Sequence, residues 1–219
     1  MKNLQEYGNI ESSLDYFLKF NIPKKAKILD IGCSYGTLIN NLYKLGYKNV
    51  YGIDINKEVI IQGKKKYKFI KNRLKIYNGI NIPFQNEIFD VILMFDVIEH
   101  IPQVEIFLKE QVFRILKKNR IFIFQTPNKH INIPWEIIQH KSFTKYKKYH
   151  CSLQTYLNLK KILIQSGFKD IKLEKYNIKT EHNINKIKVK LGVFGIFLLN
   201  IISIMPLVFQ SNFFGSGRK

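Results

Sequence analysis

The chain has 219 residues, of which 46% are hydrophobic and 14% aromatic. This apolar content suffices for one buried core, so the composition excludes a disordered chain. Lysine and arginine outnumber aspartate and glutamate by 36 to 16, and the resulting net charge of +20 favours anionic partners. Because only four of these cations are arginine, which phosphate sites prefer, we attribute most of the charge to lysine-rich codon usage.

Short apolar runs alternate with amphipathic stretches along the chain. The runs predict strands, and several amphipathic stretches end at a glycine, as helices do. In chain order, the predicted strands cover 27–31, 50–55, 74–77, 89–95, 121–124 and 168–173, and the predicted helices cover 37–45, 57–69, 103–116 and 153–164. This alternation predicts an α/β fold with a mostly parallel sheet and helices on both faces. Ligands of such sheets bind at the carboxyl ends of the strands, so the loops there hold the candidate site.

The loop after the first predicted strand reads Gly-Cys-Ser-Tyr-Gly over residues 32–36. Gly32 permits a positive φ and the close approach of a ligand, and Gly36 permits close packing of the next helix. Ser34 stands where the dinucleotide-binding pattern has its second glycine, so pyrophosphate is weakly supported and a plain turn stays open. Asp54 ends the second predicted strand, where a carboxylate can bind both hydroxyls of a ribose or cap the next helix.

Four segments resemble, in order and spacing, the motifs of class I S-adenosylmethionine-dependent methyltransferases: ILDIGCSYG, GIDIN, FDVILMFDVIEHIP and RILKKNRIFIFQTPN. The resemblance covers residues 28–176 and implies a Rossmann-like sheet with a final antiparallel strand, here within residues 213–218. It also implies an enzyme that uses S-adenosyl-L-methionine. Asp54 then holds the ribose, and Asn78 stands where an aspartate usually meets the adenine amino group. The cofactor-binding residues that the resemblance implies are Asp30, Gly32, Ser34, Gly36, Asp54, Asn78 and Phe95.

The candidate catalytic residues are two histidines. A sulfonium methyl group is already electrophilic, so the protein has to align the acceptor and, for a hydroxyl, remove its proton. His100 follows the fourth predicted strand and is a candidate base, with a role in the turn before Pro102 as the alternative. His150 is the second candidate, because the resemblance places a histidine before the helix that precedes Gly167. Glu99 is interpreted as structural.

The segment 128–150 is long and rich in aromatic residues and histidines, and we expect it to form a lid over the site. His130, His140 and His150, together with Glu136, are the residue types of a metal site. Their spacing shows no paired ligand pattern, and the two cysteines of the chain add none, so no metal is expected.

Residues 191–209 form an apolar run without a charge, interrupted by Pro206. The run is long enough to be considered as a membrane span. We expect instead a helix that contacts an anionic membrane or borders a hydrophobic substrate mouth, with packing on the sheet as the alternative. The predicted organisation is a methyltransferase domain over 1–186 and an apolar C-terminal segment over 187–219 that completes the domain or contacts membrane. The predicted location is cytoplasmic, with peripheral membrane attachment.

The favoured function is methyl transfer to an oxygen of a small or lipid-linked acceptor, such as a sugar, a polyprenyl-linked glycan or a quinone-like ring. A nucleic-acid methyltransferase using the basic stretch 57–75 is the first alternative. Against it, the loop after the fourth predicted strand does not resemble the Asn/Asp-Pro-Pro-aromatic motif of base amine methyltransferases. A cofactor-binding subunit without catalysis is the second alternative, and a nicotinamide-dependent enzyme is disfavoured by the glycine spacing.

Overall fold

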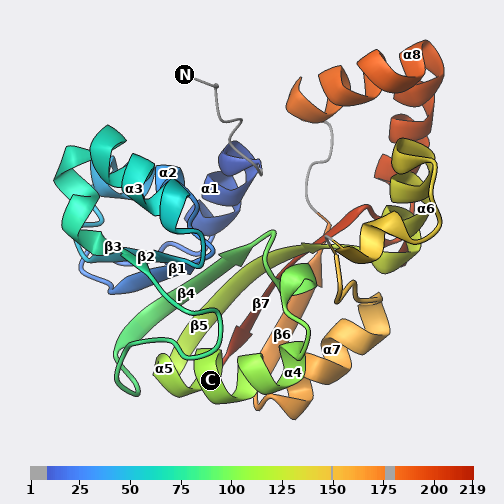
Figure 1. Ribbon diagram of the computed structural model, residues 1–219. Coiled ribbons are helices and arrows are strands. Elements are labelled where there is room, and N and C mark those ends of the chain that lie inside the picture. The colour runs from blue at the N-terminus through green and yellow to red at the C-terminus, as the bar shows by residue number, and fades with distance from the viewer. Residues whose placement is uncertain (1–8, 149, 176–180) are drawn as a thin grey trace.

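The computed structural model describes residues 9–148, 150–175 and 181–219, whose strands form one twisted sheet (Figure 1). The sheet order is β3-β2-β1-β4-β5-β7-β6, and β7 runs antiparallel to both of its neighbours while the remaining pairs are parallel. This confirms the predicted fold class, including the final antiparallel strand. The strands are β1 (Ile28–Ile31), β2 (Val50–Asp54), β3 (Leu74–Ile76), β4 (Phe89–Phe95), β5 (Leu116–Pro127), β6 (Lys169–Glu174) and β7 (Asn212–Arg218).

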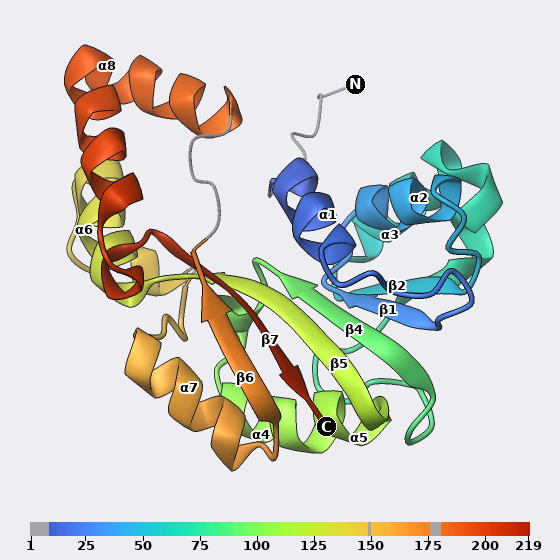
Figure 2. The same ribbon diagram turned by 180° about the vertical axis from the view of Figure 1, so that it is seen from behind.

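Helices cover both faces of the sheet, with α1 to α3 on one face and α4, α5 and α7 on the other (Figures 1 and 2). Two further helices, α6 and α8, lie beyond the carboxyl end of β5. The α-helices are α1 (Ile10–Leu18), α2 (Thr37–Lys44), α3 (Lys57–Lys66), α4 (Val104–Phe107), α5 (Phe113–Ile115), α6 (Lys129–His140), α7 (Tyr156–Gln165) and α8 (Glu181–Ile204).

Strand β4 shows why the sheet has two hydrophobic cores. Its side chains alternate between the faces, because successive residues of a strand point in opposite directions. Val91 and Leu93 pack with the helices of one face, and Ile92 and Met94 pack with those of the other; all four are at most 1% exposed. The continuous apolar run of the sequence is therefore that of a central strand buried on both sides.

Three elements differ from the sequence predictions. Helix α1 was not predicted, although Asn9 caps it and its side chain accepts a hydrogen bond from Ser12 N. The helix predicted over 103–116 contains a π-helical turn at Leu108–Val112 between α4 and α5. The segment expected as a lid folds mainly as helix α6, which contains Pro134 in its interior.

Helix α8 is bent at Gly192, whose φ of 58° and ψ of −145° are not helical. The bend sets its two arms at a steep angle, and the second arm runs beside α6 (Figures 1 and 2). Within the described residues, no helix combines the length and the apolar character that a membrane span requires. Beyond α8 the chain returns to the sheet as β7, which pairs with β5 and β6.

Candidate active site

The loop between β1 and α2 is a sharp left-handed turn. Gly32, Ser34 and Gly36 have φ angles of 78°, 49° and 81°. The N–H groups of Gly32 and Cys33 both donate to the Ile53 carbonyl, at 2.8 and 3.1 Å, and so tie the loop to the end of β2. Because these N–H groups are satisfied within the protein, and the Cys33 and Gly36 carbonyls accept hydrogen bonds from Gly36 N and Asn40 N, the remaining carbonyl oxygens of the loop are left to meet an ammonium ligand.

Close packing explains why glycines are needed in this loop. A Cβ on Gly32 would lie 2.3 Å from Val97 Cγ2, and one on Gly36 would lie 2.7 Å from Leu74 Cδ2. Both distances are well inside van der Waals contact, and both glycines have positive φ. At Gly36 the close neighbours are Leu74 of β3 and Ile70, and the requirement at Gly32 holds with or without a ligand.

Asp54 lies half-buried at the carboxyl end of β2 and organises the loop. Its Oδ2 accepts a hydrogen bond from Ser34 N, and its Oδ1 accepts one from Asn56 N, both at 2.8 Å. A carboxylate offers about four acceptor positions, so two stay available for a pair of hydroxyls. The alternative role as a helix cap belongs to Asn56, whose side chain accepts hydrogen bonds from Glu58 N and Val59 N.

The charge around this loop suits a cationic ligand. Asp30 is 4% exposed, and burial together with the nearby Asp54 carboxylate raises its pKa well above the usual range. Burial and Asp54 also raise the pKa of Tyr77 to about 12. A ligand that carries positive charge would relieve the repulsion between the two carboxylates. The sulfonium and ammonium groups of S-adenosylmethionine meet this requirement, so the residues present fit the cofactor that the sequence resemblance implied.

Asn78 and Phe95 complete the set of predicted cofactor residues. Asn78 is exposed, and its Oδ1 already accepts hydrogen bonds from Ile80 N at 3.0 Å and Asn81 N at 2.8 Å. We expected the side-chain oxygen of Asn78 to accept a hydrogen bond from the adenine amino group, but this oxygen instead stabilises the loop that follows Asn78. The Nδ2 group is left to donate to a ring nitrogen of adenine. Phe95 lies partly buried at the end of β4, next to Asp96, which has a φ of 55°.

The two candidate histidines come together although distant chain segments carry them. The ring centroids of His100 and His150 are 5.1 Å apart. Glu99 Oε1 lies 3.9 Å from His100 Nε2, and Glu99 Oε2 accepts a hydrogen bond from Thr126 Oγ1 at 3.0 Å. The backbone joins the segments as well, because Ser152 N donates to the Glu99 carbonyl at 2.9 Å. The chain thus builds one polar cluster after β4, from Glu99, His100 and His150.

Burial sets the protonation of this cluster. Burial and the neighbouring Asp96 carboxylate raise the pKa of Glu99 to about 8. Burial and His100 lower the pKa of His150, while Glu136 opposes that shift. His150 Nδ1 is buried, and the described residues offer it no hydrogen-bond partner; the nearest carboxylate, Glu136 Oε1, is 4.0 Å away. His150 is therefore neutral at neutral pH and able to accept a proton.

The sequence analysis named Glu136 as a residue type of a metal site but did not predict that it lies beside His140 and His150. Glu136 Oε2 lies 3.1 Å from His140 Nε2, one turn further along α6, and Glu136 Oε1 approaches His150. The spacing of four residues between Glu136 and His140 was the available signal. Among the described residues, the metal-ligating side chains that gather are Glu99, His100 and His150, whose ligand atoms lie within 4.8 Å of one another. This set differs from the one that the sequence suggested.

The raised pKa of Glu99 makes stability depend on pH. Between the unfolded value of 4.5 and the folded value of about 8, the folded chain holds a proton that the unfolded chain has released, so stability falls as pH rises. We expect Glu99→Gln, which keeps an acceptor for Thr126, to raise the thermal midpoint more at about pH 8.5 than at about pH 5. Scanning calorimetry checks this. The exposed control Glu105→Gln should give the same shift at both pH values, and an equal shift for Glu99→Gln would contradict the prediction.

Comparison with known proteins identifies the family and the relatives that the chain is similar to. Residues 4–173 match the family described as methyltransferase domain. A ubiquinone biosynthesis O-methyltransferase from Pelagibacter ubique is 39% identical over 109 residues, covering 48% of this chain and 44% of that protein. A demethylmenaquinone methyltransferase from Lactobacillus johnsonii is 27% identical over 188 residues, covering 74% of this chain and 76% of that protein. The chain thus spans less than half the length of the Pelagibacter relative.

Solved structures share the fold at low sequence identity. An S-adenosylmethionine-dependent methyltransferase from Mesorhizobium loti has a TM-score of 0.68 at 14% identity, covering 96% of this chain and 100% of that one. A phosphoethanolamine N-methyltransferase from Haemonchus contortus, solved with S-adenosyl-L-methionine, has a TM-score of 0.66 at 17% identity, covering 100% of this chain and 54% of that one. The family match, the strand order and the fit of the β1–α2 loop agree: the chain belongs to the class I S-adenosylmethionine-dependent methyltransferases.

Proposed function

We propose that this methyltransferase transfers a methyl group to an oxygen of a small or lipid-linked acceptor, with a quinone-type ring as the favoured class. The single observation that carries the proposal is the contact between His100, in the turn after β4, and the ring of His150, which lies before α7 in the sequence. A hydroxyl acceptor needs such a proton acceptor. The relatives named for ubiquinone and menaquinone biosynthesis support a ring of this type.

In the proposed reaction each residue of the candidate site has its own role. The cofactor supplies an electrophilic methyl group; a carbon–oxygen bond forms, a sulfur–carbon bond breaks, and the acceptor hydroxyl loses one proton. His100, whose side chain is 48% exposed, accepts that proton. Glu99, held by Thr126, and the neutral ring of His150 position His100. Asp30 and Asp54, near the carboxyl ends of β1 and β2, would hold the cofactor.

Transfer of a radiolabelled methyl group from S-adenosylmethionine into bacterial extract tests the function. The extract is divided into organic, aqueous and nucleic-acid fractions after the reaction. Label in the organic or the small-molecule aqueous fraction supports the proposal and directs purification of the acceptor. Label confined to the nucleic-acid fraction favours the basic stretch 57–75 as a binding face instead, and absence of label contradicts turnover.

Loss of the proposed base should slow turnover and leave cofactor binding intact. We expect His100→Asn to lower kcat by about 100- to 10,000-fold, with little change in the affinity for S-adenosylhomocysteine. The residual rate should increase with pH, because hydroxide then replaces the imidazole. Rate measurements with the purified acceptor over a range of pH check this, with the exposed His130→Asn as the control. An unchanged kcat would contradict the assignment.

The same cluster has the donor set of a divalent cation, so a chelator belongs in this experiment. Activity that persists after dialysis against a chelator assigns the cluster to proton transfer. Activity that is lost on chelation and restored by added zinc or magnesium assigns His100 to a cation instead.

We also propose that the second arm of α8 contacts a membrane surface. Val193, Phe197 and Ile204 share one side of this arm and are 82%, 58% and 79% exposed. Exposed apolar residues beside a lysine-rich segment suit an anionic lipid surface, which would also present a lipid-linked acceptor to the enzyme. Truncation would remove β7 from the sheet, so substitutions are the appropriate test.

We expect Val193→Ser/Phe197→Ser to float with anionic liposomes at least about fivefold less than the unaltered chain, because two exposed apolar side chains are lost. Flotation on a density gradient with phosphatidylglycerol vesicles measures this. Phe69→Ser, at a site that is 84% exposed between α3 and β3, is the control. Equal flotation of all three proteins would show that α8 is not the contact.

A further inference from the structure

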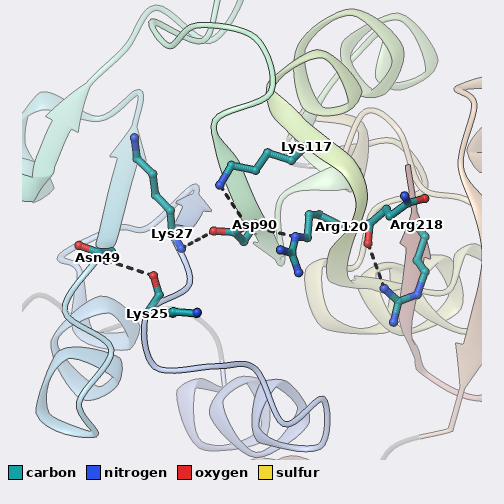
Figure 3. A network of polar contacts seen from close by, with 8 residues as sticks. Lys25, Lys27, Asn49, Asp90, Lys117, Arg120 and Arg218 are labelled. Atoms are coloured by element: carbon teal, nitrogen blue, oxygen red, sulfur yellow. Dashed lines mark hydrogen bonds and ion pairs between the residues drawn. The ribbon is translucent and has the colours of Figure 1, made fainter.

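A groove lies at the end of the sheet opposite the candidate active site. Its volume is about 470 Å³, and cations dominate its walls: Lys25, Lys117, Arg120 and Arg218 line it together with one carboxylate, Asp90. Figure 3 shows these residues converging from the segment before β1, from the start of β5 and from the end of β7. Apolar side chains, among them Phe20 and Ile121, form the floor.

The topology separates this groove from cofactor binding. Asp90 lies near the start of β4, Arg120 lies in the first half of β5, and Arg218 ends the antiparallel β7, so all three are at the amino-terminal edge of the parallel strands. The cofactor loops follow the carboxyl ends of the same strands. The concentration of charge in the groove is therefore not explained by methyl transfer.

Asp90 neutralises only part of this charge and holds two cations in place. Its Oδ2 accepts a hydrogen bond from Lys27 N at 2.9 Å, and its Oδ1 lies 3.1 Å from Lys117 Nζ and 3.2 Å from Arg120 Nε (Figure 3). Burial would raise the pKa of Asp90, but the Lys27 hydrogen bond and the two cations lower it, so Asp90 is ionised. Because Arg120 uses Nε for this ion pair, the Nη groups at its tip are left to bind a ligand.

The other two cations of the groove have no carboxylate of their own. Within the described part of the chain, no acidic side chain is in ion-pair distance of Lys25 or Arg218. Arg218 Nη1 donates only to the Asn119 carbonyl, at 3.3 Å. Four cations against one carboxylate leave a surplus of three positive charges in a space of small-molecule size.

The use of arginine here is selective. The chain has four arginines among its 36 basic residues, and two of the four line this groove. Of the other two, Arg114 is engaged with the carbonyls of Phe84 and Ile82. The fourth, Arg73, lies over the rings of Tyr43 and Tyr51. The two arginines of the groove can therefore offer phosphate the planar, bidentate contact that arginine makes with it.

We propose that this groove binds a small phosphate-bearing molecule whose apolar part rests on the floor of the groove. The phosphate is contacted by Arg120, Arg218 and Lys25. Its source is a soluble metabolite or a single lipid phosphate, not a bilayer surface, because α8 lies at the opposite end of the molecule from the chain terminus that follows Arg218 (Figures 1 and 2). One membrane could not reach both surfaces.

Calorimetric titration of the full chain, saturated with S-adenosylhomocysteine to block the cofactor site, tests this proposal. The probes are inorganic pyrophosphate, adenosine diphosphate and monomeric dihexanoyl phosphatidic acid. We expect Arg120→Gln/Arg218→Gln to weaken binding of the preferred probe at least about tenfold, because the bidentate contacts are lost. The control Lys160→Gln/Lys161→Gln removes the same charge from exposed positions on α7 and should change the affinity less than about twofold.

The probes also distinguish the sources of the phosphate. Preference for adenosine diphosphate or for phosphatidic acid over pyrophosphate supports the proposal and identifies a nucleotide-like or a lipid-like ligand. If the arginine double variant and the lysine double variant weaken probe binding equally, the probe responds to net charge only, and the proposal is overturned. Failure of all three probes to bind, or binding of a single-stranded oligonucleotide alone, would overturn it too.

Discussion

Replacement of Asp54 by alanine is expected to weaken S-adenosylhomocysteine binding by about 10- to 150-fold, or roughly 1.5–3 kcal/mol. The carboxylate would accept hydrogen bonds from the ribose, and a neutral, shorter side chain cannot. It also accepts from Ser34 N and Asn56 N, so its loss would leave the loop less well ordered before the ligand arrives. Titration calorimetry measures both effects together as a change in Kd.

Two further variants separate these contributions. Asp54→Asn keeps one acceptor oxygen for the loop but removes the charge, so its affinity should lie between those of the unaltered chain and Asp54→Ala. Asp15→Ala removes an exposed carboxylate from α1 and should leave the affinity unchanged. An unaltered Kd for Asp54→Ala would refute the placement of the ribose at the end of β2.

Gly63→Ala is expected to destabilise the protein although Gly63 lies inside helix α3. Alanine in an open helical position normally adds about 0.5–1 kcal/mol of stability over glycine. Here a Cβ would lie 2.2 Å from the Tyr35 carbonyl oxygen, a backbone atom that cannot rotate away. We therefore expect a loss of about 1–3 kcal/mol, as in other overpacked interiors.

Urea denaturation followed by circular dichroism measures this loss. Because Tyr35 belongs to the β1–α2 loop, the same clash should shift the loop and weaken S-adenosylhomocysteine binding. Gln62→Ala, at the preceding position of the helix, is the control and should change stability by less than about 0.5 kcal/mol. A gain in stability for Gly63→Ala would mean that α3 can move away from the loop at little cost.

The sequence predicted the structure correctly where a local pattern is typical of one type of secondary structure. Apolar runs such as 89–95, set between helix-like stretches, fit strands buried between two layers of helices, and the parallel sheet was predicted correctly. The positive φ of Gly32 was expected because a sharp strand-to-helix turn needs it, whereas that of Gly36 was not predicted. The sequence patterns did not indicate helix α6, which continues through Pro134 where neighbours in space decide the local structure.

The sequence by itself determined the fold class, the family motifs and the loops that carry the site, because these follow from spacing along the chain. Only the tertiary structure decided which side chains share a site. The ring of His100 packs against that of His150, and Arg120 and Arg218 line one groove, because the sheet order brings distant segments together. Burial then changes the pKa of groups in the candidate site. Glu99 is 1% exposed and its pKa rises to about 8, and no feature of the neighbouring sequence predicts this shift.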